Sequence, residues 1–131
     1  MELSFPWPMS QGEWLAWISA VATLLLGVFF LFAAGTGLRV LRLQTTPAHP
    51  QALAEIRGRM SGFYLGLGLS AILLAQPLIY MALGFSWAFT AFGRLVSMLS
   101  DGGGKPYNLA LLVVEAVLAA LPLLFAFGLI P

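Results

Sequence analysis

Two ionisable residues interrupt apolar segments in the second half of the chain, and they are the first candidates for chemistry. Arg94 lies six residues before Ser100, about 9 Å into its segment at 1.5 Å per helical residue. Glu115 lies eight residues after Tyr107, about 12 Å into the next segment. Both segments start from the same link, and a guanidinium fork matches a carboxylate well. The sequence therefore predicts a buried ion pair between Arg94 and Glu115.

Other polar residues extend this pair into a predicted cluster at one end of the helices. Ser97 and Asp101 share a helical face with Arg94, and Asn108 shares a face with Glu115. The expected cluster comprises Glu55, Arg57, Arg94, Ser97, Asp101 and Glu115. Such a cluster either fixes which helices pair and in what register, or it binds an ion or a polar head group. Both roles stay open.

Several other kinds of chemistry are excluded. The chain has no cysteine, so disulfides, thiolate metal sites and cysteine nucleophiles are ruled out. The one histidine, His49, stands between two prolines and is interpreted as a loop residue. The segment 101–105 resembles a phosphate loop, but Leu99 replaces the first glycine and Pro106 replaces the Ser or Thr. We expect a turn there, and neither a metal nor a cofactor.

Four apolar stretches must position these residues. Only 8% of the residues are charged and 60% are hydrophobic, whereas soluble domains are about a quarter charged. About 20 apolar residues cross a bilayer as a helix, and the predicted spans are 14–38, 60–82, 84–99 and 109–130, with a cytoplasmic loop at 39–59. The expected fold is all-α, an integral membrane four-helix bundle that forms a single domain over residues 1–131.

Basic residues predict the orientation of these spans, because Lys and Arg near spans stay in the cytoplasm. All six lie in or beside the two links that would share one face, namely Arg39, Arg42, Arg57, Arg59, Arg94 and Lys105. The N- and C-termini are therefore expected outside. Aromatic residues at the opposite ends of the spans are interpreted as interfacial anchors, and these are Trp7, Trp14, Trp17, Tyr80 and Trp87.

Prolines and small residues shape the expected packing. Pro77 and Pro122 are predicted to bend their helices and to free the carbonyls of Leu73 and Leu118. A ridge of small residues four apart runs along the second helix, formed by Gly58, Gly62, Gly66 and Ser70, with a possible counterpart at Ser19, Thr23 and Gly27. We expect the ridge to pack within the chain; a dimer interface is the alternative.

The chain resembles a bacterial membrane family known as domain of unknown function 4345. The similarity covers about residues 50–125 and rests on Glu55-Ile-Arg-Gly58, the glycines of 62–68, Gly93-Arg-Leu-Val-Ser97, Asp101-Gly102 and Glu115. The chain departs from the family pattern at Met60-Ser61-Gly62 and at Gly103-Gly104-Lys105. The resemblance implies four helices, a bacterial inner membrane and a multi-pass topology, but no activity. A looser similarity to DoxX-like proteins is limited to the fold.

Three classes of function follow from these observations. The leading hypothesis is a small non-enzymatic membrane protein that acts as an accessory subunit or binds an amphiphile such as a lipid, quinone or pigment. It would contact the bilayer and either a membrane-protein partner or further copies of itself. The alternative is an oligomeric small-solute transporter or channel lined by the two buried charges. A membrane enzyme is third, because no catalytic set of residues is visible. Nucleic acid is not an expected partner, since the net charge is only +1.

Overall fold

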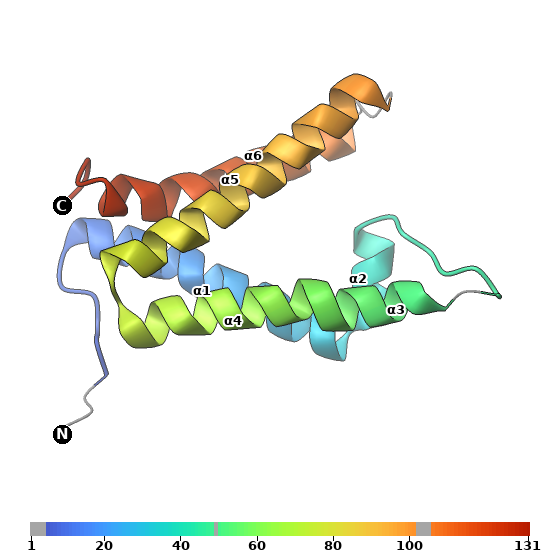
Figure 1. Cartoon of the computed structure of the whole chain (residues 1–131), viewed down its shortest axis with the longest axis horizontal. Coiled ribbons are helices and arrows are strands. Elements are labelled where there is room, and N and C mark those ends of the chain that lie inside the picture. Colours follow the sequence, from blue (N-terminus) through green and yellow to red (C-terminus); the bar gives the residue numbers. More distant parts are fainter. Residues whose placement is uncertain (1–4, 49, 102–105) are drawn as a thin grey trace.

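A computed structural model describes residues 5–48, 50–101 and 106–131. The elements are α1 (Gln11–Phe32), α2 (Ala34–Val40), α3 (Gln51–Glu55), a π-helical segment η1 (Ile56–Met60), α4 (Ser61–Leu74), α5 (Pro77–Ser100) and α6 (Pro106–Ala126) (Figure 1). No strand occurs in these three ranges, so the predicted all-α fold is confirmed. His49 and the link residues 102–105, including Lys105, lie outside the described residues.

Among the described residues, three helices are long and apolar enough to cross a membrane, namely α1, α5 and α6, with 22, 24 and 21 residues. By itself α4 has only 14 residues. However, the backbone stays in the right-handed helical region at Ile56 and at Ser61, where α3, η1 and α4 join. These three elements therefore form one continuous helical rod from Gln51 to Leu74 (Figure 1).

The break between the second and third long helices differs from the predicted one. It lies at Ala75 and Gln76, not between the predicted segments 60–82 and 84–99. Ala75 adopts the left-handed conformation with φ 49°, Gln76 is extended, and Pro77 takes the first position of α5. Proline is favoured there because the first helical N–H needs no intrahelical partner. Pro77 thus starts a helix and does not bend one.

This boundary also corrects the interpretation of two aromatic residues. Tyr80 and Trp87 were expected at the membrane interface, but both lie inside α5 and are only 1% and 4% exposed. They belong to the core that α1, α4, α5 and α6 build together. Trp7 and Trp14, by contrast, are exposed at the N-terminal end of the molecule.

The helices pack as two antiparallel pairs, α1 with α4 and α5 with α6, and α1 also packs along α6. Close approach within each pair depends on glycine. A Cβ added at Gly68 would lie 2.7 Å from the backbone nitrogen of Leu24, and one at Gly84 would lie 3.1 Å from the Ala119 carbonyl oxygen. The backbones of paired helices are therefore in near contact, as is usual for membrane helices.

The two pairs diverge from one end of the molecule to the other (Figure 1). At the closed end lie the start of α1, the last residues of the chain and the turn from α4 to α5, and the N–H of Gly12 donates to the carbonyl of Pro131 at 3.0 Å. At the open end lie α2, α3, the end of α5 and the start of α6. The structure thus places the start of α1 and the last residues of the chain at the same end of the molecule.

Three buried hydroxyl groups connect α1 to its neighbours. Ser61 of α4 donates to the Gly27 carbonyl at 2.7 Å, and Ser19 of α1 donates to the Leu118 carbonyl of α6 at 2.7 Å. That carbonyl has no helical partner because Pro122 lacks an N–H. The freed Leu118 carbonyl was predicted from the proline, and the structure shows that Ser19 satisfies it. The third hydroxyl belongs to Thr23 and is part of the candidate site.

Candidate functional site

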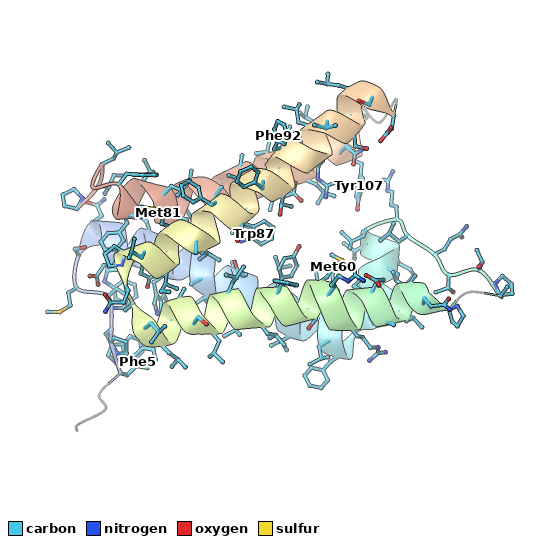
Figure 2. The ribbon with its side chains drawn as sticks, viewed as in Figure 1. Phe5, Met60, Met81, Trp87, Phe92 and Tyr107 are labelled. Carbon is cyan, nitrogen blue, oxygen red and sulfur yellow. The ribbon has the colours of Figure 1, made fainter. Side chains whose placement is uncertain are left out.

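A cavity of about 490 Å³ lies between the two helix pairs toward their open end, and we call it the inter-pair cavity. Every long helix contributes to its walls, and so do η1 and the end of α2. Figure 2 shows Met60, Trp87 and Tyr107 lying between the two pairs. Most of the lining is aliphatic or aromatic, and the volume falls within the range of about 300–1,000 Å³ that is usual for small-molecule sites.

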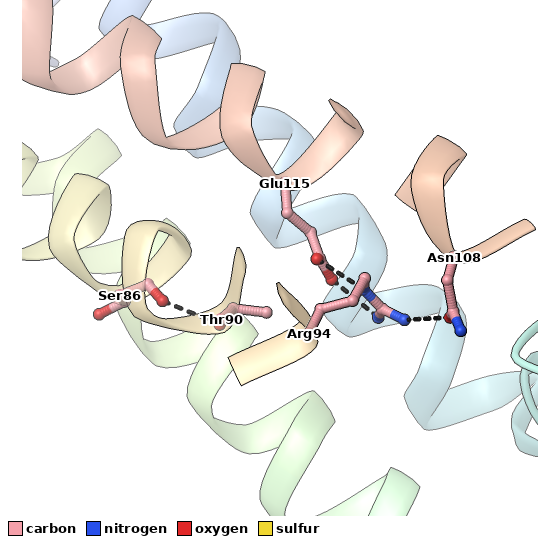
Figure 3. Close-up of polar contacts among 5 residues, drawn as sticks. All are labelled: Ser86, Thr90, Arg94, Asn108 and Glu115. Atoms are coloured by element: carbon pink, nitrogen blue, oxygen red, sulfur yellow. Dashed lines mark hydrogen bonds and ion pairs between the residues drawn. The ribbon is translucent and has the colours of Figure 1, made fainter. Parts of the chain in front are cut away.

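The ion pair of Arg94 and Glu115 forms one polar wall of this cavity. The Arg94 Nε donates to Glu115 Oε1 at 2.7 Å, and Nη2 donates to Oε2 at 2.9 Å (Figure 3). The Arg94 Nη1 also donates to Asn108 Oδ1 at 3.1 Å. Glu115 is only 6% exposed, whereas the Arg94 side chain is 24% exposed. The predicted ion pair is present in bidentate form, and the guanidinium is the member that faces the cavity more openly.

Aromatic rings form the wall on the closed side of the cavity. The Trp87 Nε1 donates to Thr23 Oγ1 at 2.8 Å, and Thr23 in turn donates to the Ser19 carbonyl at 2.8 Å. The Tyr64 ring stacks on Trp87 with 5.1 Å between centroids. The Trp87 indole is therefore held by a hydrogen bond and by a stacked ring.

Contacts at the open end join α2 to α6 beside the cavity. The Tyr107 hydroxyl donates to the Val40 carbonyl, and the Arg42 guanidinium carbon lies 4.1 Å from the centroid of the Tyr107 ring. This distance is typical of a cation–π contact. Val40 and Tyr107 both line the cavity, so its open end is bounded by a hydrogen bond and a ring contact.

The structure does not gather the full predicted cluster. Glu55 pairs with Arg59 at 3.2 Å on the exposed surface, and Arg57 donates to the Leu31 carbonyl at 2.9 Å. Ser97 donates to Asp101 at 2.8 Å, also on the surface. Among the residues that the structure describes, no ion pair joins these groups to Arg94 or Glu115. The reason is that α3 and η1 belong to one helix pair and the end of α5 to the other, and the pairs diverge here (Figure 1).

The small-residue ridge is also placed differently from our expectation. A Cβ added at Gly58, Gly62 or Gly66 would have no neighbour within 4 Å among the described residues, so these glycines do not pack against that part of the chain. Together with Ser70 these glycines line a groove of about 590 Å³ on the outside of α4. The small residues of α1 do pack against α4, but on its other face, at Ser61, Leu65 and Gly68.

Sequence reasoning missed the aromatic residues of the cavity. Tyr64 lies between two glycines of the ridge and was not singled out, and Trp87 was assigned to the membrane interface. A helix that starts at Pro77 places Trp87 ten residues further along, about 15 Å deep at 1.5 Å per residue. Reading the proline as a helix start was therefore the signal that could have identified this buried ring.

The polar groups of the cavity are suited to hydrogen bonding. In residues 5–48, 50–101 and 106–131, no group of three metal-ligating side chains comes together. The walls instead provide a balanced ion pair, a phenol and apolar surface.

Comparison with known proteins gives a family and nothing further. The search of curated proteins finds no match, and neither does the search of solved structures. One family model, described as a domain of unknown function (DUF4345), matches residues 12–126. The match runs from the start of α1 to the end of α6 and so includes every helix that lines the cavity. The chain belongs to the DUF4345 family.

Proposed function

We propose that this chain is a multi-pass membrane protein that holds one amphiphile molecule in the inter-pair cavity and performs no reaction on it. Apolar side chains on the outside of the long helices support the membrane setting. Leu78, Phe89 and Leu99 of α5 are 74%, 72% and 80% exposed, and such surfaces are unfavourable in water. The rod from Gln51 to Leu74 is the fourth crossing in this proposal, which makes the molecule a four-helix bundle.

The observation that carries the proposal is an apolar cavity with one polar wall. An amphiphile has the same two-part character, with a hydrocarbon body and a small polar head. The body would contact side chains such as Leu26, Phe29 and Leu111, and the head would meet Arg94. Because the walls come from four different helices, a bound molecule would also join the two helix pairs at the end where they diverge.

The proposal also includes the orientation of the molecule in the membrane. Arg39, Arg42, Arg57 and Arg59 all lie at the open end of the bundle, opposite to the termini (Figure 1). Basic residues near spans are retained in the cytoplasm. We therefore propose that the open end faces the cytoplasm of a bacterium and that both termini lie on the opposite side of its inner membrane. A reporter fused to either terminus should then be active only on the outer side.

Purification in mild detergent followed by native mass spectrometry tests the binding function. We expect a bound apolar molecule in stoichiometric amount. Leu111→Trp should lower its recovery, because this side chain lines the cavity and the larger ring would occupy part of the space that the ligand needs. Val113→Trp on the same helix is the matched control, since Val113 is 56% exposed and lies outside the cavity. Recovery of the bare chain from wild type and control alike would refute the proposal.

A second candidate is association with another copy of the chain through the outward ridge of Gly58, Gly62, Gly66 and Ser70. Ridges of small residues let two membrane helices approach closely, and the three glycines of this ridge have no neighbour in the part of the chain that the structure describes. The chain has no cysteine, so Ser70→Cys gives a single reporter of proximity. We expect Ser70→Cys to crosslink in membranes and Phe89→Cys, on α5, not to do so. Equal crosslinking of the two variants would exclude this interface.

A further inference from the structure

The polar wall of the inter-pair cavity restricts the chemical class of the ligand head. We infer that the cavity selects a neutral amphiphile whose head presents an oxygen acceptor of the carbonyl or ester type. The inference rests on the proposed function and goes beyond it, because amphiphile binding alone does not specify a head group. It follows from two observations: the charges of the wall neutralise each other, and several hydrogen-bond donors of the wall are unused.

Charge in the cavity wall is already neutralised. The lining contains one cation, Arg94, and one anion, Glu115, and these form two hydrogen bonds of 2.7 and 2.9 Å with each other. An anionic head placed beside Arg94 would compete with Glu115 for the same cation. The charge of the Glu115 carboxylate, which is only 6% exposed, would then be less completely neutralised. A cationic head would meet carboxylate oxygens that each already accept a hydrogen bond. Buried charges without a partner are strongly unfavourable, so the wall favours a neutral head.

Hydrogen-bond donors remain unused on the same wall. A guanidinium carries five N–H groups, and the Arg94 side chain uses three of them, on Glu115 and Asn108. Two N–H groups thus have no partner in the part of the chain that the structure describes. The Tyr64 hydroxyl lines the cavity and also has no hydrogen-bond partner there. These donors match an oxygen with lone pairs, such as that of a ketone or an ester.

Two other donors of the lining are already used within the chain. The Trp87 N–H is taken by Thr23, and the Tyr107 hydroxyl is taken by the Val40 carbonyl. Thr90 donates to the Ser86 carbonyl at 2.8 Å and leaves only its lone pairs. Thr90 is exposed and belongs to α5, one turn before Arg94. A head group with an acceptor oxygen therefore finds its donors at Arg94 and Tyr64.

Three probes with the same sixteen-carbon chain separate these possibilities: methyl hexadecanoate, hexadecanoate and hexadecane. Each is titrated into the full chain in maltoside micelles, and native mass spectrometry measures the bound fraction. We expect the methyl ester to bind at least about tenfold more tightly than either of the others, since a net hydrogen bond contributes about a fivefold factor and two or three are available. Tyr64→Phe should weaken ester binding by about fivefold and leave hexadecane unchanged.

The double variant Arg94→Met with Glu115→Leu removes the guanidinium donors without leaving an unpaired charge, and it keeps the Tyr64 hydroxyl. It should reduce the preference for the ester over hexadecane to about the fivefold factor of that one hydroxyl, and Tyr64→Phe provides the test if the double variant does not fold. Hexadecanoate binding as tightly as the ester would overturn the inference and leave the proposed function in place. If the wild-type chain bound none of the probes, or if Leu111→Trp bound them all equally well, the inference and the proposed function would both fail.

Discussion

Removing either partner of the Arg94–Glu115 pair should destabilise the fold unequally. Arg94→Leu leaves the Glu115 carboxylate, which is 6% exposed, with no described hydrogen-bond donor. Breaking a buried pair in this way costs about 3–5 kcal/mol. Glu115→Leu leaves a guanidinium that is 24% exposed toward the cavity and still donates to Asn108. The loss is then closer to that of one charged hydrogen bond, about 1.5–3 kcal/mol.

The double variant Arg94→Leu with Glu115→Leu provides the control for this prediction. Replacing a buried ion pair by apolar residues is often neutral or stabilising. The free energy of unfolding of the double variant should therefore lie within about 1 kcal/mol of the wild-type value. The free energy of unfolding is measured by denaturant titration in mixed micelles, with tryptophan fluorescence as the signal. The reasoning is refuted if Glu115→Leu is the more harmful single change. It is refuted equally if the double variant loses the sum of the two single effects.

Three further predictions use the same unfolding measurement. Gly68→Ala should lower the free energy of unfolding by about 1–3 kcal/mol, because the new Cβ would lie 2.7 Å from the backbone of α1. Gly62→Ala, on the outward ridge, should not lower it and should raise it by up to about 1 kcal/mol through helix propensity. Equal effects of the two variants would contradict the placement of these glycines on opposite faces of α4. Ser19→Ala should cost about 1–3 kcal/mol, since it leaves a buried carbonyl of α6 without a donor; an unchanged stability would argue against that hydrogen bond. Trp87→Phe removes the indole donor, and we expect a loss of about 0.5–1.5 kcal/mol, while a stabilised variant would contradict the buried position of the ring.

Composition and hydrophobic length were sufficient to predict the all-α fold, because apolar helical segments of about 20 residues leave few alternatives. The ion pair was predictable for a similar reason. Arg94 and Glu115 each interrupt an apolar helix at a comparable depth from the same link, so two antiparallel neighbours bring them together. The two parallel hydrogen bonds of the pair and the contact of Arg94 with Asn108 could be seen only in the structure.

The position of the α4–α5 turn was not predictable from hydropathy, because only Gln76 is polar there and the residues on both sides of it are as apolar as the helices themselves. A left-handed Ala75 ends α4, and no glycine marks the site. The error moved Trp87 from the core to the membrane surface in our prediction and so concealed one wall of the cavity.

The direction of the glycine ridge depended on which face of α4 meets α1. Both faces carry small residues, with Gly58, Gly62 and Gly66 on one and Ser61 and Gly68 on the other. A π-helical segment immediately before α4 also alters the phase of the helix. Spacing alone could not choose between the two faces.

The hydrogen bond from Ser19 to the Leu118 carbonyl has a consequence for synthesis at the ribosome. Its donor and acceptor lie 99 residues apart, so the donor helix emerges long before the acceptor is made. Until α6 has been inserted, the Ser19 hydroxyl has to find another acceptor, for example within its own helix. Completion of the tertiary structure must therefore wait for the last helix.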